Sequence, residues 1–213
     1  ATFLSFSQGC AFGYRIGSPG GVGALVDLAG DDRYECGEFG QGCGYYLGLG
    51  VLSDASGNDL YVGNRYAQGT AAHQAFGVLL DSAGDDLYHG VTAANQGAAW
   101  DMSAAMLVDR AGDDVYRGGV LSQGAAAQQA IGVLVDFEGN DSYHAGVASQ
   151  GRADGNQYHW SATRCPSFGA LWDADGRNTF NSGRQDGQVT RTGSAVAPEG
   201  ADGRTQWGLF LAR

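Results

Sequence analysis

The sequence contains no lysine, only three prolines, and no apolar run long enough to cross a bilayer. Its 12 basic residues are all arginine and stand against 23 acidic residues, which gives a net charge of −11. This balance argues against nucleic acid or an anionic membrane as a partner, because both are themselves negatively charged. The scarcity of proline excludes collagen-like chains and proline-rich linkers. Residues 1–30 do not have the pattern of a secretory signal peptide.

The common catalytic motifs are also missing. The chain has no Gly-x-Ser-x-Gly, no phosphate-binding loop and no zinc-binding helix, and its four cysteines lack the Cys-x-x-Cys spacing of structural zinc sites. A nucleophile formed by His159 and Cys165 has no evident orienting group. His89 and His144 occupy equivalent repeat positions, where the other residues vary as on a surface. We therefore expect no catalytic residues and no enzyme activity.

Glycine is abundant, with 37 residues, and a turn rich in carboxylates recurs through the chain. The leading aspartates of this turn are 27 or 28 residues apart, except for a last interval of 37. A fixed period in this range is typical of a solenoid. The first Gln-Gly pair, at Gln8, lacks a preceding turn, so we expect the chain to begin within a repeat. The turns are DLAGDDRY (27–34), DASGNDLY (54–61), DSAGDDLY (81–88), DRAGDDVY (109–116), DFEGNDSY (136–143) and the degenerate DADGRNTF (173–180).

Other positions keep step with these turns. A leucine lies two residues before each leading aspartate, an aromatic residue lies seven after it, and a Gln-Gly pair follows. In stacked coils the leucines would fill the interior, the aromatic rings would stack, and the glutamines could form an amide ladder. The leucines are Leu25, Leu52, Leu79, Leu107, Leu134 and Leu171; the aromatic residues are Tyr34, Tyr61, Tyr88, Tyr116, Tyr143 and Phe180; the glutamines are Gln8, Gln41, Gln68, Gln96, Gln123 and Gln150.

Short β-branched segments between glycine-rich turns predict an all-β fold, a parallel β-solenoid of about six coils of ~27 residues. We assign residues 1–176 to the solenoid, with insertions at 10–22 and 152–168, and residues 177–213 to a C-terminal cap. An α/β horseshoe is the alternative, because segments such as AAAQQAIG (125–132) are rich in helix-forming residues. The strands before each aspartate are apolar on both faces, so they need a cover, either that helix or a neighbouring molecule.

The carboxylates form two columns in such a stack. Adjacent carboxylates at ~4.8 Å would repel by roughly 3.5 kcal/mol at an effective dielectric constant near 20. Nothing basic recurs beside them, and a hard divalent cation held by oxygen ligands between coils would compensate. We therefore predict Ca²⁺ as a cofactor; turns that are solvated or bonded to the backbone are the alternative. The predicted ligands are Asp27, Asp32, Asp54, Asp59, Asp81, Asp86, Asp109, Asp114, Asp136 and Asp141.

The motif Gly-x-Asp-x-Tyr, as in GNDLY (57–61) and GDDVY (112–116), resembles part of the repeats-in-toxin nonapeptide. The resemblance implies a secreted β-roll in which aspartates and turn carbonyls bind calcium between coils. Carried over by position, the ligands would be the aspartates of the second column, and Asn178 would end the series. This column consists of Asp32, Asp59, Asp86, Asp114 and Asp141, five residues after each leading aspartate. The chain departs from that family because the leading Gly-Gly is missing and the motif occurs once per coil.

Cys10 and Cys43 each follow a Gln-Gly pair in consecutive repeats, and stacking would place them within reach of a disulfide. Cys36 and Cys165 could pair by elimination. Disulfides and calcium both suit an extracellular or cell-surface location.

We expect a structural or interaction module of an adhesin, surface filament or scaffold, which binds itself or other surface proteins through its apolar strand face. Residues of that face are Val78, Leu80, Met106, Val108, Val133, Val135 and Trp172. The alternative is a solenoid that binds or cleaves polysaccharide, with sugars stacked on aromatic residues outside the repeated column. Those aromatic residues are Tyr45, Tyr46, Tyr66, Trp100, Tyr158 and Trp160.

Overall fold

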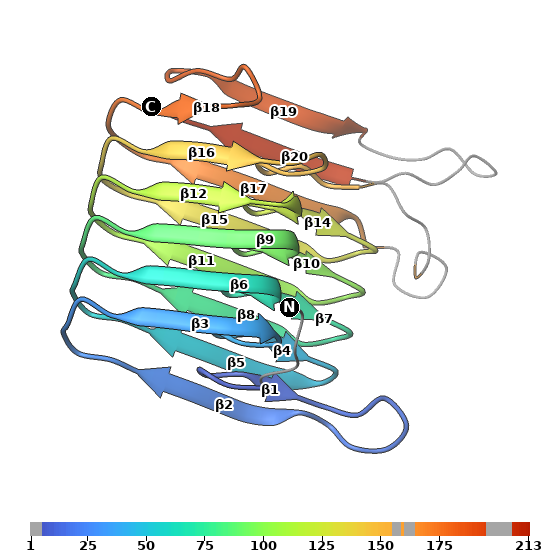
Figure 1. Ribbon diagram of the computed structural model, residues 1–213. Helices are drawn as coiled ribbons and strands as arrows, with labels where there is room; N and C mark the ends of the chain where they lie inside the picture. Colours follow the sequence, from blue (N-terminus) through green and yellow to red (C-terminus); the bar gives the residue numbers. More distant parts are fainter. Residues whose placement is uncertain (1–5, 155–158, 160–164, 195–205) are drawn as a thin grey trace.

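The chain folds into stacked coils of parallel β-strands, as the computed structural model shows (Figure 1). The structure describes residues 6–154, 159, 165–194 and 206–213. The all-β solenoid is confirmed, with about five turns. No helix is present among the described residues, so the α/β horseshoe is wrong, and no helix there could cross a membrane.

The strands of the coils form three sheets. We name two of them by the residues they present to the core, the leucine sheet and the tyrosine sheet, and call the third, with two-residue strands, the short sheet. The leucine sheet contains β2 (Gly21–Val26), β5 (Gly48–Ser53), β8 (Phe76–Leu80), β11 (Ala104–Asp109), β15 (Ile131–Asp136), β17 (Ser167–Asp173), β20 (Gln206–Leu211) and β19 (Val189–Ser194). The tyrosine sheet contains β3 (Arg33–Glu38), β6 (Leu60–Ala67), β9 (Leu87–Asn95), β12 (Val115–Gly118), β16 (Ser142–Ala145) and β18 (Thr179–Phe180), and β13 (Val120–Ser122) pairs with β9. The short sheet contains β1 (Ala11–Phe12), β4 (Gly44–Tyr45), β7 (Ala71–Ala72), β10 (Ala99–Trp100) and β14 (Ala126–Ala127).

The coils stack in register, so equivalent residues of the repeat lie directly above one another. Leu79 pairs with Leu52 and Leu107, and the leucines pack against the tyrosine column in one buried core. The rings of Tyr61 and Tyr88 stack with their centroids 4.8 Å apart, the spacing of adjacent strands. Both predicted columns are confirmed.

Residues with a left-handed backbone form the corners of each coil, which explains why the helix-forming segments do not become helices. In the segment 125–132, strand β14 is followed by Gln128 and Gln129, whose φ angles are 57° and 60°. Two successive left-handed residues end a strand and cannot continue a right-handed helix. Gly84 (φ 147°) has a different role, because a Cβ there would lie 1.6 Å from the carbonyl oxygen of Gly57 in the preceding coil.

The glutamine column does not form the predicted amide ladder. The Nε2 of Gln96 donates to the carbonyl oxygens of Tyr88 (3.1 Å) and Arg117 (2.9 Å), which belong to its own coil and the next. The amide therefore bonds to the backbone of the tyrosine sheet and not to the next glutamine.

The region assigned as a cap continues two of the sheets. Strand β18 extends the tyrosine sheet, and β20 extends the leucine sheet with Phe210 opposite Leu171. Strand β19 then pairs antiparallel with β20 at the end of the sheet. This change of direction ends the parallel stacking.

The outward side of the leucine sheet is almost wholly apolar, and we call it the apolar face. It has three outward positions on each of six neighbouring strands, and all are apolar except Ser53. The sheet lies behind the tyrosine sheet in Figure 1. The positions are Val22, Ala24, Val26, Leu49, Val51, Ser53, Phe76, Val78, Leu80, Ala104, Met106, Val108, Ile131, Val133, Val135, Phe168, Ala170 and Trp172.

Candidate metal centre

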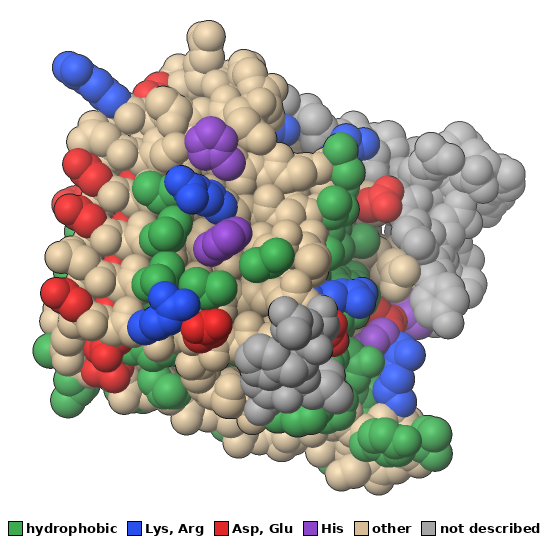
Figure 2. Space-filling view, in the orientation of Figure 1, with side chains coloured by type: hydrophobic (Ala, Val, Ile, Leu, Met, Phe, Trp, Pro, Cys, Tyr) green, Lys and Arg blue, Asp and Glu red, His purple; other side chains and the backbone are tan. Residues whose placement is uncertain are grey.

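The carboxylate columns lie in the turns that lead from the leucine sheet to the tyrosine sheet. Acidic side chains gather at this edge, on the left of Figure 2; the exposed ones include Asp31, Asp85 and Asp113. The two columns predicted as ligands lie beneath them: Asp54 and Asp81 are 0% exposed, whereas Asp27 and Asp32 of the first coil are partly exposed. Solvation therefore does not describe the inner coils, while bonds to the backbone, the other form of that alternative, are present.

The leading aspartates Asp54, Asp81 and Asp109 each accept two kinds of hydrogen bond. One carboxylate oxygen accepts the backbone N–H two residues further on, as from Ala111 to Asp109 (3.2 Å). The other accepts the tyrosine hydroxyl of the preceding coil, as from Tyr88 to Asp109 (2.6 Å). The first bond fixes the turn, as aspartates in turns commonly do. The second connects adjacent coils through the core.

The second-column aspartates bond along the stack. The Oδ1 of Asp114 accepts the backbone N–H of Asp86 (2.7 Å), and the Oδ1 of Asp141 accepts that of Asp114 (2.8 Å). The Oδ2 atoms of Asp114 and Asp141 are buried and have no hydrogen-bond partner. Such an atom is costly inside a protein, so these two oxygens point to an occupant that supplies a positive charge or a proton.

Among the described residues, no basic side chain forms an ion pair with the columns. The ion pairs found there involve Asp101 and Glu35 instead. Burial is the main cause of the raised pKa of these carboxyls, and the negative charge of neighbouring aspartates raises it further. The pKa reaches about 6 for Asp59, about 8 for Asp86, about 11 for Asp114 and about 7 for Asp141.

The structure brings all ten predicted ligands together in four groups along the stack. In each group, one carboxylate oxygen from each of three aspartates lies within 4.8 Å of the others. Asp86 and Asp114 each belong to two groups, so neighbouring groups share a carboxylate. The groups are Asp27, Asp32 and Asp54; Asp59, Asp81 and Asp86; Asp86, Asp109 and Asp114; and Asp114, Asp136 and Asp141.

The donors fit a hard divalent cation. All are oxygens, each group carries up to three negative charges, and Asp114 and Asp141, whose Oδ2 atoms are unpartnered, are members of these groups. A cation at ~2.3–2.6 Å from its ligands leaves them up to ~5 Å apart, which is compatible with carboxylate oxygens that lie within 4.8 Å of one another. The absence of thiol and imidazole donors from the groups favours Ca²⁺ or Mg²⁺ over zinc.

The series of groups ends before Asn178. The Oδ1 of Asn178 accepts the backbone N–H of Asp141 (2.7 Å), as an aspartate does elsewhere in the column. Its Nδ2 donates to the Oδ1 of Asp173 (2.8 Å). An amide at this position therefore supplies the donor that the other coils lack.

A second charged cluster was missed by the sequence analysis. Asp101, which is buried in a corner of the short-sheet side, contacts His73 through Oδ2 and His159 through Oδ1, and Arg15 lies 3.3 Å from Oδ2. Arg15 and His159 come from the two predicted insertions. Hydrogen bonds and charge from the two histidines lower the pKa of Asp101 despite its burial. One feature of the sequence could have indicated this cluster: both insertions interrupt the repeat, and each carries a cationic or ionisable side chain, Arg15 in one and His159 in the other.

The predicted disulfides are not formed, although all four cysteines lie within the described residues. Cys10 and Cys43 do lie on adjacent coils, and burial followed by contact with Cys10 raises the pKa of the Cys43 thiol. Pairing of Cys36 with Cys165 is wrong on geometric grounds. Four coils separate them, which at ~4.8 Å per coil is about 19 Å, far beyond the span of a disulfide.

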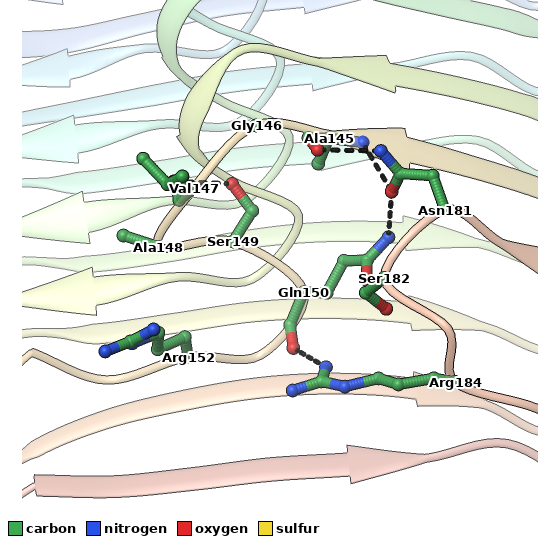
Figure 3. A pocket seen from close by; sticks show the side chains of 10 residues that line it. All are labelled: Ala145, Gly146, Val147, Ala148, Ser149, Gln150, Arg152, Asn181, Ser182 and Arg184. Carbon is green, nitrogen blue, oxygen red and sulfur yellow. Dashed lines mark hydrogen bonds between the residues drawn. The ribbon is translucent and has the colours of Figure 1, made fainter.

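Figure 3 shows a pocket of about 360 Å³ where the tyrosine sheet meets the C-terminal region. Asn181 lies between Ala145 and Gln150: its Nδ2 donates to the carbonyl oxygen of Ala145 (2.9 Å), and its Oδ1 accepts from Gln150 Nε2 (3.2 Å). Arg184 donates to the carbonyl oxygen of Gln150. These contacts attach the C-terminal region to the last coil.

The aromatic residues considered for sugar stacking pack largely against one another. Tyr66 is buried, stacks on Phe39 and meets Tyr45 edge to face. Trp100 packs against Tyr66 in the same cluster. Tyr158 and Trp160 lie outside the described residues. The cluster thus stabilises one corner of the coils.

Comparisons with known proteins leave the geometry as the basis for interpretation. No protein-family model matches the chain, and neither a curated protein nor a solved structure matches it. The repeats-in-toxin resemblance is thus limited to the shared turn motif and a compatible parallel solenoid with clustered aspartates and tyrosines.

Proposed function

We propose that this chain is a calcium-stabilised structural module, a scaffold segment of an adhesin, surface filament or similar extracellular assembly. The observation that carries the proposal is the series of buried aspartate groups that lack a basic partner and retain unpartnered oxygens. Their burial makes ionised carboxylates unfavourable unless a cation joins them.

Calcium would act here as an axial connection between coils. In three of the four groups a cation would bind one second-column aspartate from one coil and both aspartates of the next, as with Asp59, Asp81 and Asp86. In the first group it would bind both aspartates of the first coil and the leading aspartate of the second. Because Asp86 and Asp114 are shared between groups, binding at one group would order ligands of its neighbour. This supports a long, stiff solenoid that folds fully where calcium is plentiful.

The extracellular location is part of the same proposal. Extracellular calcium modules bind with dissociation constants of roughly 10⁻⁴–10⁻³ M, which suits their surroundings. The shared turn motif makes a β-roll-like mode of calcium binding the specific form of the proposal, with turn carbonyls as additional ligands.

The test is thermal unfolding followed by circular dichroism at pH 8, with calcium, with magnesium and with chelator. A site filled to 100 times its dissociation constant adds about 2.7 kcal/mol. For a chain of this size, that amount corresponds to an increase of roughly 5–11 °C in Tm per site. We expect calcium to raise Tm by at least that amount and magnesium by less. Coincident curves in all three solutions at pH 8 would contradict the proposal and leave protons as the occupants of the groups.

A further inference from the structure

The apolar face leaves one side of a parallel sheet uncovered. Parallel sheets are normally covered on both faces, and large exposed apolar patches mark sites of association. Phe76 is 59% exposed, Met106 40% and Trp172 38%, although the chain carries a net charge of −11. None of the positions that form this face carries a charge.

We propose that two copies of this chain pair through their apolar faces, with the leucine sheets packed face to face. The inference deepens the proposed function, because it identifies the partner of the structural module as a second copy. Six strands ~4.8 Å apart and about six residues of ~3.3 Å in length give each copy a flat area of roughly 600 Å². Pairing two such faces would bury about 1,200 Å², the lower limit for stable protein interfaces.

The relief of the face is self-complementary. A hollow of about 670 Å³ lies over one side of it, lined by Leu80, Met106, Val108, Val135, Phe137 and Trp172. Phe76 projects from the other side of the same face, at the opposite end of β8 from Leu80. The first, second and third outward positions of the strands form three rows along the stack; on β8 the first row holds Phe76 and the third holds Leu80. A two-fold axis parallel to the stacking direction places the first row of one copy over the third row of its partner. Each Phe76 then faces the Leu80 side of the partner's hollow.

The charges are arranged as such a pair requires. Arg110 and Glu138 border the hollow at its outer edge and remain free to meet water or each other at the rim. An uncharged centre with a polar rim is the usual composition of a protein interface. The acidic turns lie outside the paired area, so the negative charge does not have to be desolvated.

The experiment measures the mass of the full chain in solution by sedimentation and light scattering, at 10–100 μM protein, with calcium and with chelator. We expect twice the 22.0 kDa chain mass for the wild type. Met106→Arg places a charge at the centre of the face and should lower association at least 100-fold. Val91→Arg is the matched control, because Val91 is also an exposed apolar strand residue (51%) but belongs to the tyrosine sheet; it should remain paired.

Phe76→Ser is the second variant and keeps the test decisive if Met106→Arg does not fold. It removes the projecting ring from a side chain that is mostly exposed, so folding should be retained and association lost. A wild type of 22.0 kDa at 100 μM, or a paired or larger species that survives both substitutions, overturns the inference. Mass and melting are separate readouts: a folded monomer stabilised by calcium refutes the pairing alone, and a dimer indifferent to calcium refutes the calcium proposal alone.

Discussion

Asp101 and Asp114 are both buried aspartates at corners of the solenoid, and the structure treats them in opposite ways. Asp101 contacts His73 and His159 and lies 3.3 Å from Arg15, and its pKa is lowered. Asp114 accepts a backbone N–H, keeps an unpartnered oxygen beside other aspartates, and has a pKa raised to about 11. Burial raises the pKa of both, so the difference comes from the partners.

The comparison shows that the chain can supply cations to a buried carboxylate when one is needed. It does so at Asp101 with residues from two insertions, at a single place that the repeat does not reproduce. The repeated turns carry no basic residue at a recurring position: Arg33, Arg110 and Arg177 occupy three different positions of the turn. None of the ion pairs found among the described residues joins them to the carboxylate columns. A negative charge that recurs in every coil is neutralised most simply by a bound cation that can also recur, one for each group of aspartates along the stack.

The largest expected effect is on the pH dependence of stability without metal. The folded carboxyls of Asp59, Asp86 and Asp141 have pKa values above the ordinary 3.8, so the folded state binds more protons than the unfolded state between pH 3.8 and about 6–8. The free energy of unfolding must therefore fall as pH rises through this window. At 1.36 kcal/mol per pKa unit, the raised pKa of Asp141 corresponds to a decrease on the order of 4 kcal/mol in the free energy of unfolding as pH rises from 3.8 to above 7.

Urea unfolding at pH 5, 7 and 9 measures this dependence in chelator and in calcium. Calcium should remove most of the loss, because it stabilises the ionised carboxylates. A protein in chelator that is as stable at pH 9 as at pH 5 would show that the buried columns are charged without a partner, contrary to the geometry.

The next effect is a pair of substitutions with opposite signs. Asp114→Asn should stabilise the calcium-free protein, in chelator at pH 8, by about 2 kcal/mol or more. The amide is neutral without binding a proton, and its Nδ2 can donate a hydrogen bond at the position where Oδ2 of Asp114 has no partner. Asn178 already shows this arrangement in the same column. Asp101→Asn should destabilise by about 1–3 kcal/mol, because it leaves Arg15 without its carboxylate and disrupts the contacts with His73 and His159.

Calcium titration by calorimetry completes that comparison. Asp114 belongs to two of the four groups, so Asp114→Asn should reduce calcium uptake, whereas Asp101→Asn should leave it unchanged. Equal loss of calcium in both variants would place the ion elsewhere in the molecule.

Much of the fold was predictable from the sequence because the fixed spacing of the repeat determines which residues pair between adjacent strands. The leading aspartates, the leucines and the tyrosines recur at one spacing, and stacking by that spacing gives the columns that the structure shows. The cluster at Asp101 was not predictable, because it joins four residues separated by up to 144 positions through two segments with no counterpart in other coils. The glutamine contacts were also missed, since spacing alone does not determine where an amide points.

The smallest expected effect concerns the hydroxyl that joins the core to the carboxylates. Tyr88 donates to Asp109 (2.6 Å), and Tyr88→Phe removes this bond while the ring can still stack, as Phe180 does at the end of the column. We expect a loss of about 1 kcal/mol in chelator at pH 3, because burial raises the pKa of Asp109 above 3.8 and the carboxyl is protonated there. In calcium at pH 8 the acceptor is ionised, and the loss should approach about 2 kcal/mol.

His144→Ala is the control for this substitution, because His144 is an exposed side chain of the same sheet and should change stability by no more than about 0.5 kcal/mol. Both variants are compared by urea unfolding under the two conditions. An equal loss for Tyr88→Phe in both conditions would show that Asp109 keeps one charge state throughout. A greater loss in calcium would show that the cation and the tyrosine hydroxyl stabilise the same ionised carboxylate, which distinguishes this column from Asp101, where histidine and arginine do so.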